Sequence, residues 1–138
     1  TKKCFLPQIP GITPKFLRHI ELKIQQGGIP FLGRKTSNYI GSTRFKEAPK
    51  SMGISHIIAL IDAWPPSVLQ MAKGPVRAST MTWNIEFTHQ SQMNEKADWL
   101  GYHCETRHAD DGYMHSDANV YNGQHLLAIS RQCVTVFD

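Results

Sequence analysis

The sequence predicts an α+β domain in which a curved antiparallel sheet packs against one apolar helix. Residues 80–87 alternate between apolar and polar side chains, which is the period of a strand. Residues 55–71 instead space their apolar side chains as a buried helix does. Turn signals at 110–112 and 122–123 divide the C-terminal part into further strands. The expected order is therefore strand, strand, helix and four strands.

Residues 1–15 are predicted to form an extended lead-in. Three prolines and a glycine lie between Pro7 and Pro14, which excludes a regular helix there. Because the chain does not begin with Met and shows no signal-peptide pattern, we expect a fragment or a processed piece. At 138 residues the chain has the size of one domain, so residues 16–138 are predicted to form a single domain.

Two strands are predicted before the helix. Residues 16–25 alternate in part and end at a Gly27-Gly28 break. The side chains expected on one side are Phe16, Arg18, Ile20, Leu22 and Ile24. A second strand is predicted at Tyr39 to Phe45, after a loop that contains Gly, Ser and Asn residues.

The predicted helix contains the most apolar run of the chain, IIALIDAWPP at 57–66. Ser55 is a suitable N-cap, and Pro65-Pro66 must kink or restart the helix because proline cannot donate a backbone hydrogen bond. Asp62 places one carboxylate inside this run. An unpaired buried carboxylate is costly, so we expect Asp62 to have hydrogen-bond partners or a functional use.

The four later strands are predicted to follow one another as a meander. In the first, Met81, Trp83, Ile85 and Phe87 are expected on one face, opposite Thr80, Thr82, Asn84 and Glu86. The next two strands are expected at 97–106 and 113–121. A tight hairpin at 122–123 then leads into the last strand, at 126–136.

Composition excludes several classes of protein. The formal net charge of +4 is mild and the cations are scattered, so we expect no nucleic acid partner but an attraction for a small anionic ligand. No run approaches the roughly 20 apolar residues of a membrane span, so we expect a soluble protein without a membrane partner. The three cysteines and seven histidines show no metal-ligand spacing, which indicates no metal site and fits a reducing, cytoplasmic setting.

The element order and three segments resemble the C-terminal half of the acyl-CoA thioesterase II family. The segments are the helix HIIALIDAWPP, the strand ASTMTWNIEF and the closing DGYMHSDANVYNGQHLLAISRQCVTVFD. The resemblance implies a hotdog fold, with the sheet wrapped around one long central helix and paired with a second hotdog unit. It also implies hydrolysis of acyl-CoA without a metal or organic cofactor, through a water held by Asp62, Thr80 and Gln132.

The chemistry of these three residue types suits that role. A thioester carbonyl is electrophilic enough that water needs only orientation and a nearby base. Asp62 can accept the proton of the water, while the hydroxyl of Thr80 and the amide of Gln132 can fix its approach. Oxyanion donors are expected among the backbone N–H groups at 53–56. Alternatively, Asp62 caps the segment after the prolines, Thr80 is an ordinary strand residue and Gln132 faces solvent.

Two other functions stay open. A hotdog hydratase places a His five residues after the helix Asp, and Ser67 at that position argues against dehydration chemistry. The second is a non-catalytic acyl-CoA-binding or structural unit. Either way, the hotdog site lies between two units, so we expect a partner unit. That partner is a second copy of the chain or the N-terminal half of the same parent protein, since an uncovered sheet edge is a liability.

Overall fold

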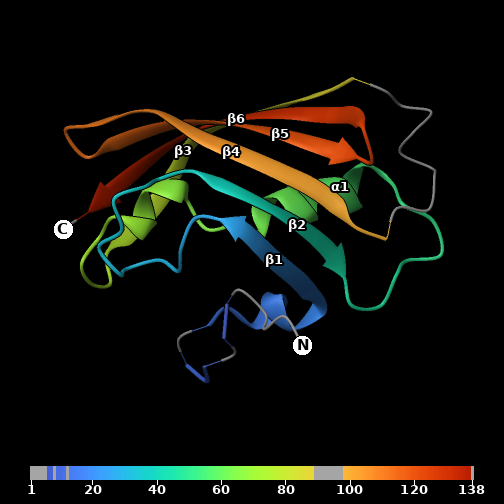
Figure 1. The fold of residues 1–138 in the computed structure, drawn as a ribbon, viewed down its shortest axis with the longest axis horizontal. Helices are drawn as coiled ribbons and strands as arrows, with labels where there is room; N and C mark the ends of the chain where they lie inside the picture. The colour runs from blue at the N-terminus through green and yellow to red at the C-terminus, as the bar shows by residue number, and fades with distance from the viewer. Residues whose placement is uncertain (1–5, 8, 12, 89–97, 138) are drawn as a thin grey trace.

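The computed structural model describes residues 6–7, 9–11, 13–88 and 98–137 and confirms the α+β class. Six antiparallel strands form one sheet that curves around the helix α1 (Figure 1). The helical elements are η1 (Lys15–His19, a 3-10 helix), α1 (Ile54–Asp62) and η2 (Ser67–Gln70, also 3-10). The strands are β1 (Ile20–Gln26), β2 (Tyr39–Phe45), β3 (Arg77–Phe87), β4 (Leu100–Asp110), β5 (Tyr113–Asn122) and β6 (His125–Phe137).

The strand order is β1-β2-β4-β5-β6-β3, so the predicted meander is correct only for β4, β5 and β6. β3 pairs along its length with β6 instead of β4, and it forms one edge of the sheet. Side chains 77–82 of β3 are all exposed, on both faces of the strand. The strand itself was predicted correctly, but its pattern of side chains carries no information about which strand is the neighbour.

The helix is interrupted at the two prolines, as predicted, and the central helix is therefore shorter than expected. α1 covers only nine residues and ends at Asp62, and the chain turns again as η2 directly after Pro66. The helix begins after Gly53 rather than Ser55. The N–H of Gly53 donates to Nδ1 of His56 at 3.0 Å, so the imidazole holds the helix start in place of a Ser side chain.

The first predicted strand begins four residues later than expected, at Ile20, because the preceding residues form η1. Within the lead-in, the hydroxyl of Thr13 donates to the carbonyl of Pro7 at 2.6 Å and accepts from the N–H of Ile9 at 2.9 Å. These bonds fold the described lead-in residues into a turn beside β1 (Figure 1). The predicted starts at Thr1 and Ala97 lie outside the described residues.

The core lies between α1 and the inner face of the sheet, meaning the face toward the helix. α1 contributes Ile57, Leu60 and Ile61, which follow the i, i+3, i+4 spacing of one helix face. Just beyond α1, the Trp64 ring stacks on Tyr102 with a centroid distance of 4.6 Å and an interplanar angle of 8°. Among the described residues, no helix is long and apolar enough to cross a membrane.

Candidate functional site

Thr80 and Gln132 contact each other directly across β3 and β6. Nε2 of Gln132 donates to Oγ1 of Thr80 at 2.8 Å. The pair is open to solvent in the single chain, since Thr80 is exposed and Gln132 is half-buried. The amide keeps one further N–H and its carbonyl oxygen, so the pair can still hold a small polar molecule between them.

A β-bulge places Thr80 on the inner face. Thr80 pairs with Val134, but the next register pair is Thr82 with Cys133, so β3 has one extra residue at this point. The bulge moves Thr80 to the face that also carries Trp83, which is opposite Gln132. The predicted separation of Thr80 from Trp83 is therefore wrong, because strict alternation fails where a residue is inserted.

Asp62 is exposed, which corrects the expectation of a buried carboxylate. It is the last residue of α1 and lies next to the buried Ile61 stripe rather than in it. Within the described residues its carboxylate forms no hydrogen bond or ion pair, so nothing there satisfies it. η2 begins after Pro66 without a side-chain cap, so Asp62 does not cap that segment.

Asp62 lines an apolar cavity of about 550 Å³. The other walls come from the lead-in, the β1–β2 loop (residues 27–38) and the chain after α1, and they include Ile9, Phe16, Ile29, Phe31, Trp64 and Leu69. Asp62 is the one titratable side chain among the described lining residues. A carboxylate is therefore presented at the wall of a space that suits an aliphatic group.

Within the described residues Asp62 forms no hydrogen bond with Thr80 or Gln132, although all three lie on the same side of the sheet. Thr80 and Gln132 lie on the inner face of the sheet, and α1 packs on that same face. No hydrogen bond joins Asp62 to either residue in the described part of the chain. The structure thus brings two of the three predicted residues together and places the third on the helix that covers their face.

The predicted oxyanion donors lie at the other end of α1. In helix geometry the N–H groups of Ile54 and Ser55 have no acceptor within the helix. Eight residues separate Ile54 from Asp62, which is about 12 Å along the axis at 1.5 Å per residue. The helix start and the carboxylate of one chain are therefore too far apart to contact the same carbonyl group.

Ser67 has a structural role. Its buried hydroxyl lies 2.8 Å from Oγ1 of Thr106 and so links η2 to β4. Among the described residues, no group of acidic, His and Cys side chains is arranged to hold a metal ion. The cysteine at position 4 lies outside the described residues.

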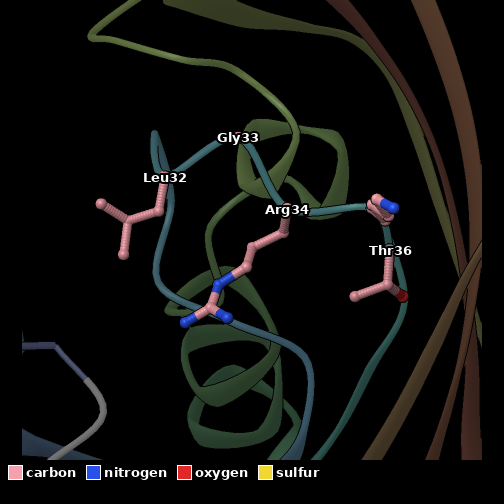
Figure 2. Close-up of a pocket in the computed structure, with 5 residues that line it drawn as sticks. Leu32, Gly33, Arg34 and Thr36 are labelled. Atoms are coloured by element: carbon pink, nitrogen blue, oxygen red, sulfur yellow. The ribbon is translucent and has the colours of Figure 1, made fainter.

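A second concave site, which lies on the β1–β2 loop, was not predicted from the sequence. Residues Leu32, Gly33, Arg34, Lys35 and Thr36 of the β1–β2 loop line a space of about 720 Å³ (Figure 2). We call it the basic hollow. Its signal in the sequence is a long stretch without acidic residues, from 22 to 46 and again from 63 to 85.

Comparison with protein families agrees with this geometry. The chain matches the family model of the acyl-CoA thioesterase C-terminal domain over residues 4–136. The chain belongs to this family. No curated protein matches the sequence of this acyl-CoA thioesterase C-terminal domain significantly.

Solved structures with the same fold support the hotdog assignment. A conserved hot dog protein of unknown function from Alicyclobacillus acidocaldarius has a TM-score of 0.77 at 18% identity, covering 100% of this chain and 56% of that one. A proposed thioesterase II from Thermobifida fusca has a TM-score of 0.72 at 16% identity, covering 96% of this chain and 54% of that one. A hypothetical thioesterase from Streptococcus pneumoniae, solved with coenzyme A, has a TM-score of 0.59 at 13% identity, covering 85% of this chain and 86% of that one. The domain thus spans just over half the length of the first two proteins.

Proposed function

We propose that this domain hydrolyses the thioester of an acyl-CoA to a free acid and CoA. The observation that carries the proposal is the Gln132–Thr80 hydrogen bond on the sheet face that packs α1, the helix that presents Asp62. These are the three residues that the thioesterase resemblance assigns to the hydrolytic water. Family membership and the apolar cavity at Asp62 support the same reaction class.

In this mechanism the hydroxyl of Thr80 and the amide of Gln132 hold a water molecule against the thioester carbonyl. Asp62 accepts a proton from the water while the water oxygen forms a bond to the carbonyl carbon. This step gives a tetrahedral oxyanion. The carbon–sulfur bond then breaks, and the thiolate of CoA takes up the proton. Because the 2.8 Å amide–hydroxyl bond already exists, the water meets a preformed pair and little side-chain ordering is needed.

We further propose that a second hotdog unit completes the site. Asp62 and Thr80 are both exposed in the single chain, which leaves the proposed water open to solvent. Within the described residues, β3 has a neighbouring strand on one side only, and such an edge favours pairing with another strand. A partner could also bring its own helix start to the thioester, since the start of α1 lies about 12 Å from Asp62.

The test is release of free thiol from short, medium and long acyl-CoAs by wild type and Asp62→Asn. The amide keeps the shape of the side chain but cannot act as a base, so we expect kcat to fall by about 100-fold or more. The matched control is Asp111→Asn, which removes a carboxylate from the β4–β5 turn at a φ of 51°. Asn tolerates that conformation, so its activity should equal wild type.

The assay also separates the proposed enzyme from a non-catalytic acyl-CoA-binding or structural unit. Activity that survives in Asp62→Asn would remove the carboxylate from the mechanism. No turnover by folded wild type, with its oligomeric state measured by light scattering, would leave the binding unit as the better interpretation. Repeating the assay with a co-expressed N-terminal half would then show whether the partner was missing.

A further inference from the structure

The basic hollow brings together cations that are distant in the sequence. Arg34 and Lys35 of the β1–β2 loop line it, and Lys73, which follows η2, lies beside it. A Cβ on Gly33 would lie 3.2 Å from Cγ of Lys73, so the stem of that lysine passes directly over the loop. All three cationic side chains are exposed, so their charged ends are available to a ligand.

The loop that carries the hollow is fixed to η2 by its backbone. The N–H groups of Phe31, Gly33 and Arg34 donate to carbonyls in the 69–72 segment at 2.7, 2.9 and 2.8 Å. Phe31 and Gly33 both adopt positive φ, at 68° and 61°, a conformation that is uncommon for a bulky residue such as Phe31. A strained turn held by three hydrogen bonds is typical of a loop that has to present its side chains in one arrangement.

Gln70 fixes the same loop from inside the protein. Its fully buried amide accepts from the N–H of Gly28 at 2.6 Å and donates to the carbonyls of Asn38 and Ser67 at 3.2 and 3.0 Å. The first and last parts of the β1–β2 loop are thus both bonded to one side chain. The hollow is therefore largely preorganised, which lowers the entropic cost of binding.

The side chain of Arg34 packs against the backbone at Gly28. A Cβ at Gly28 would lie 2.8 Å from Nε of Arg34, so the guanidinium arm lies across the start of the loop against Gly28. Figure 2 shows this arm extending away from Thr36. Gly28 and Gly33 together provide backbone surfaces on which the stems of Arg34 and Lys73 rest.

The positive charge of the hollow is not neutralised by the protein. Within the described residues, Arg44, Arg107 and Arg131 form ion pairs with carboxylates, whereas Arg34, Lys35 and Lys73 form none. Neither segment that builds the hollow contains an acidic residue. Two unpaired cations that line one concave surface, with a third beside it, attract a multiply charged anion.

The basic hollow also continues from the apolar cavity. Ile29, Pro30 and Phe31 line the cavity that holds Asp62, and the next five residues of the same loop line the hollow. The loop thus joins a cationic surface to an apolar space, and Asp62 of α1 lies at the wall of that space. An acyl-CoA has the matching order of aliphatic chain, thioester and phosphate groups.

We propose that the basic hollow binds the 3′-phosphate and diphosphate of the CoA portion of the substrate. Arg34, Lys35 and Lys73 supply the charge, and Thr36 adds a hydroxyl donor. The proposal rests on the proposed function because it extends the same substrate beyond its thioester. It assigns the discrimination between CoA thioesters and shorter thioesters to this loop.

Equilibrium binding tests this proposal without any need for turnover. Isothermal titration would compare CoA, dephospho-CoA and pantetheine on wild type and on the triple variant Arg34→Gln/Lys35→Gln/Lys73→Gln. We expect the variant to bind CoA at least tenfold more weakly and pantetheine equally well. Wild type should prefer CoA over dephospho-CoA, and raised salt should reduce that preference. The control Lys15→Gln/Lys46→Gln/Lys50→Gln removes the same charge elsewhere and should bind like wild type.

Each outcome is decisive for one of the two proposals. Equal binding of CoA to wild type and to the folded triple variant would overturn the basic hollow. Inorganic phosphate at millimolar concentration should compete only weakly, and vesicles containing phosphatidylserine should not bind; strong binding of either without selectivity for CoA would also overturn it. If CoA binds as expected while no acyl-CoA is hydrolysed, the result supports the proposed CoA site in the basic hollow and contradicts the proposed hydrolysis. Unchanged hydrolysis of an acyl-pantetheine by the triple variant would show that the reacting end is intact.

Discussion

Thr43 has a buried hydroxyl that meets no hydrogen-bond partner in the described part of the chain. It lies in β2 between Leu22 of β1 and Leu100 of β4, so its surroundings are apolar. A buried polar group without a partner costs about 1–3 kcal/mol. We expect Thr43→Val, which has the same shape, to raise the free energy of unfolding by about 1 kcal/mol.

Urea unfolding measures this effect, and Thr43→Ser serves as the control. Serine keeps the hydroxyl and loses the methyl group, so it should destabilise the domain. If Val lowered the free energy of unfolding as much as Ser does, Thr43 would have a partner that the static structure does not contain.

The three residues assigned to the hydrolytic water differ in how far the sequence could define them. Their identities follow from the thioesterase resemblance, and the contact of Thr80 with Gln132 agrees with it. The exposure of Asp62 did not follow from its apolar run, because a helix buries one face and Asp62 is one residue past that face. Arg34 and Lys73 were not found because only the fold brings them together.

At the scale of elements, Trp64 joins the end of α1 to the sheet through Gly41. A Cβ at Gly41 would lie 2.5 Å from Cη2 of Trp64 and 2.2 Å from the carbonyl oxygen of Lys23. Neither neighbour has room to move, because the indole is stacked on Tyr102 and the carbonyl belongs to β1. We expect Gly41→Ala to lower the free energy of unfolding by at least about 3 kcal/mol.

The matched control for this prediction is Gly101→Ala on the neighbouring strand β4. There a Cβ would meet its nearest atom, Cβ of Tyr121, at 3.4 Å, which is close to ordinary contact. The difference between the two melting temperatures isolates the crowding at Gly41. Equal melting temperatures would mean that Trp64 can leave its place without cost.

The spacing of apolar residues in the sequence predicted most helices and strands, but it did not predict which strands are neighbours in the sheet. The turn at 110–112 and the bounds of β2 are confirmed, and the second hairpin turns one residue later than predicted, at 123–124, since local turn chemistry and alternation largely determine them. The position of β3 beside β6 depends on contacts between residues about 50 positions apart, which no local pattern records. The bulge at Thr80 likewise depends on the register with β6 and not on the residues of β3 alone.

At the scale of the whole molecule, the core responds to alkaline pH. Burial raises the pKa of the Cys104 thiol above its ordinary value of 9.0, although hydrogen bonds with Tyr102, Ser67 and Ser116 act in the opposite direction. Burial also raises the pKa of Tyr39 and Tyr102 above 10.0. The folded state therefore keeps protons that the unfolded chain has already released.

The contribution of these three groups to stability should accordingly be constant well below pH 9 and fall as the pH rises above it. Urea unfolding between about pH 7 and 10.5 measures this dependence. In Cys104→Ala the decline should begin nearer pH 10, where the tyrosines of the unfolded chain start to ionise. A decline that starts at the same pH in both proteins would mean that Cys104 does not contribute.

The Gln132–Thr80 bond joins residues 52 positions apart, and one of its strands is the last in the described chain. During synthesis, α1 and β3 leave the ribosome well before β6, and without β6 the strand β3 has no neighbour in the sheet. The nascent chain therefore exposes an unpaired β3 until translation of β6 is complete. Thr80 and Gln132, the two proposed water ligands, can therefore come together only after β6 has been synthesised, so a chain truncated before β6 would expose Asp62 but never assemble the proposed site.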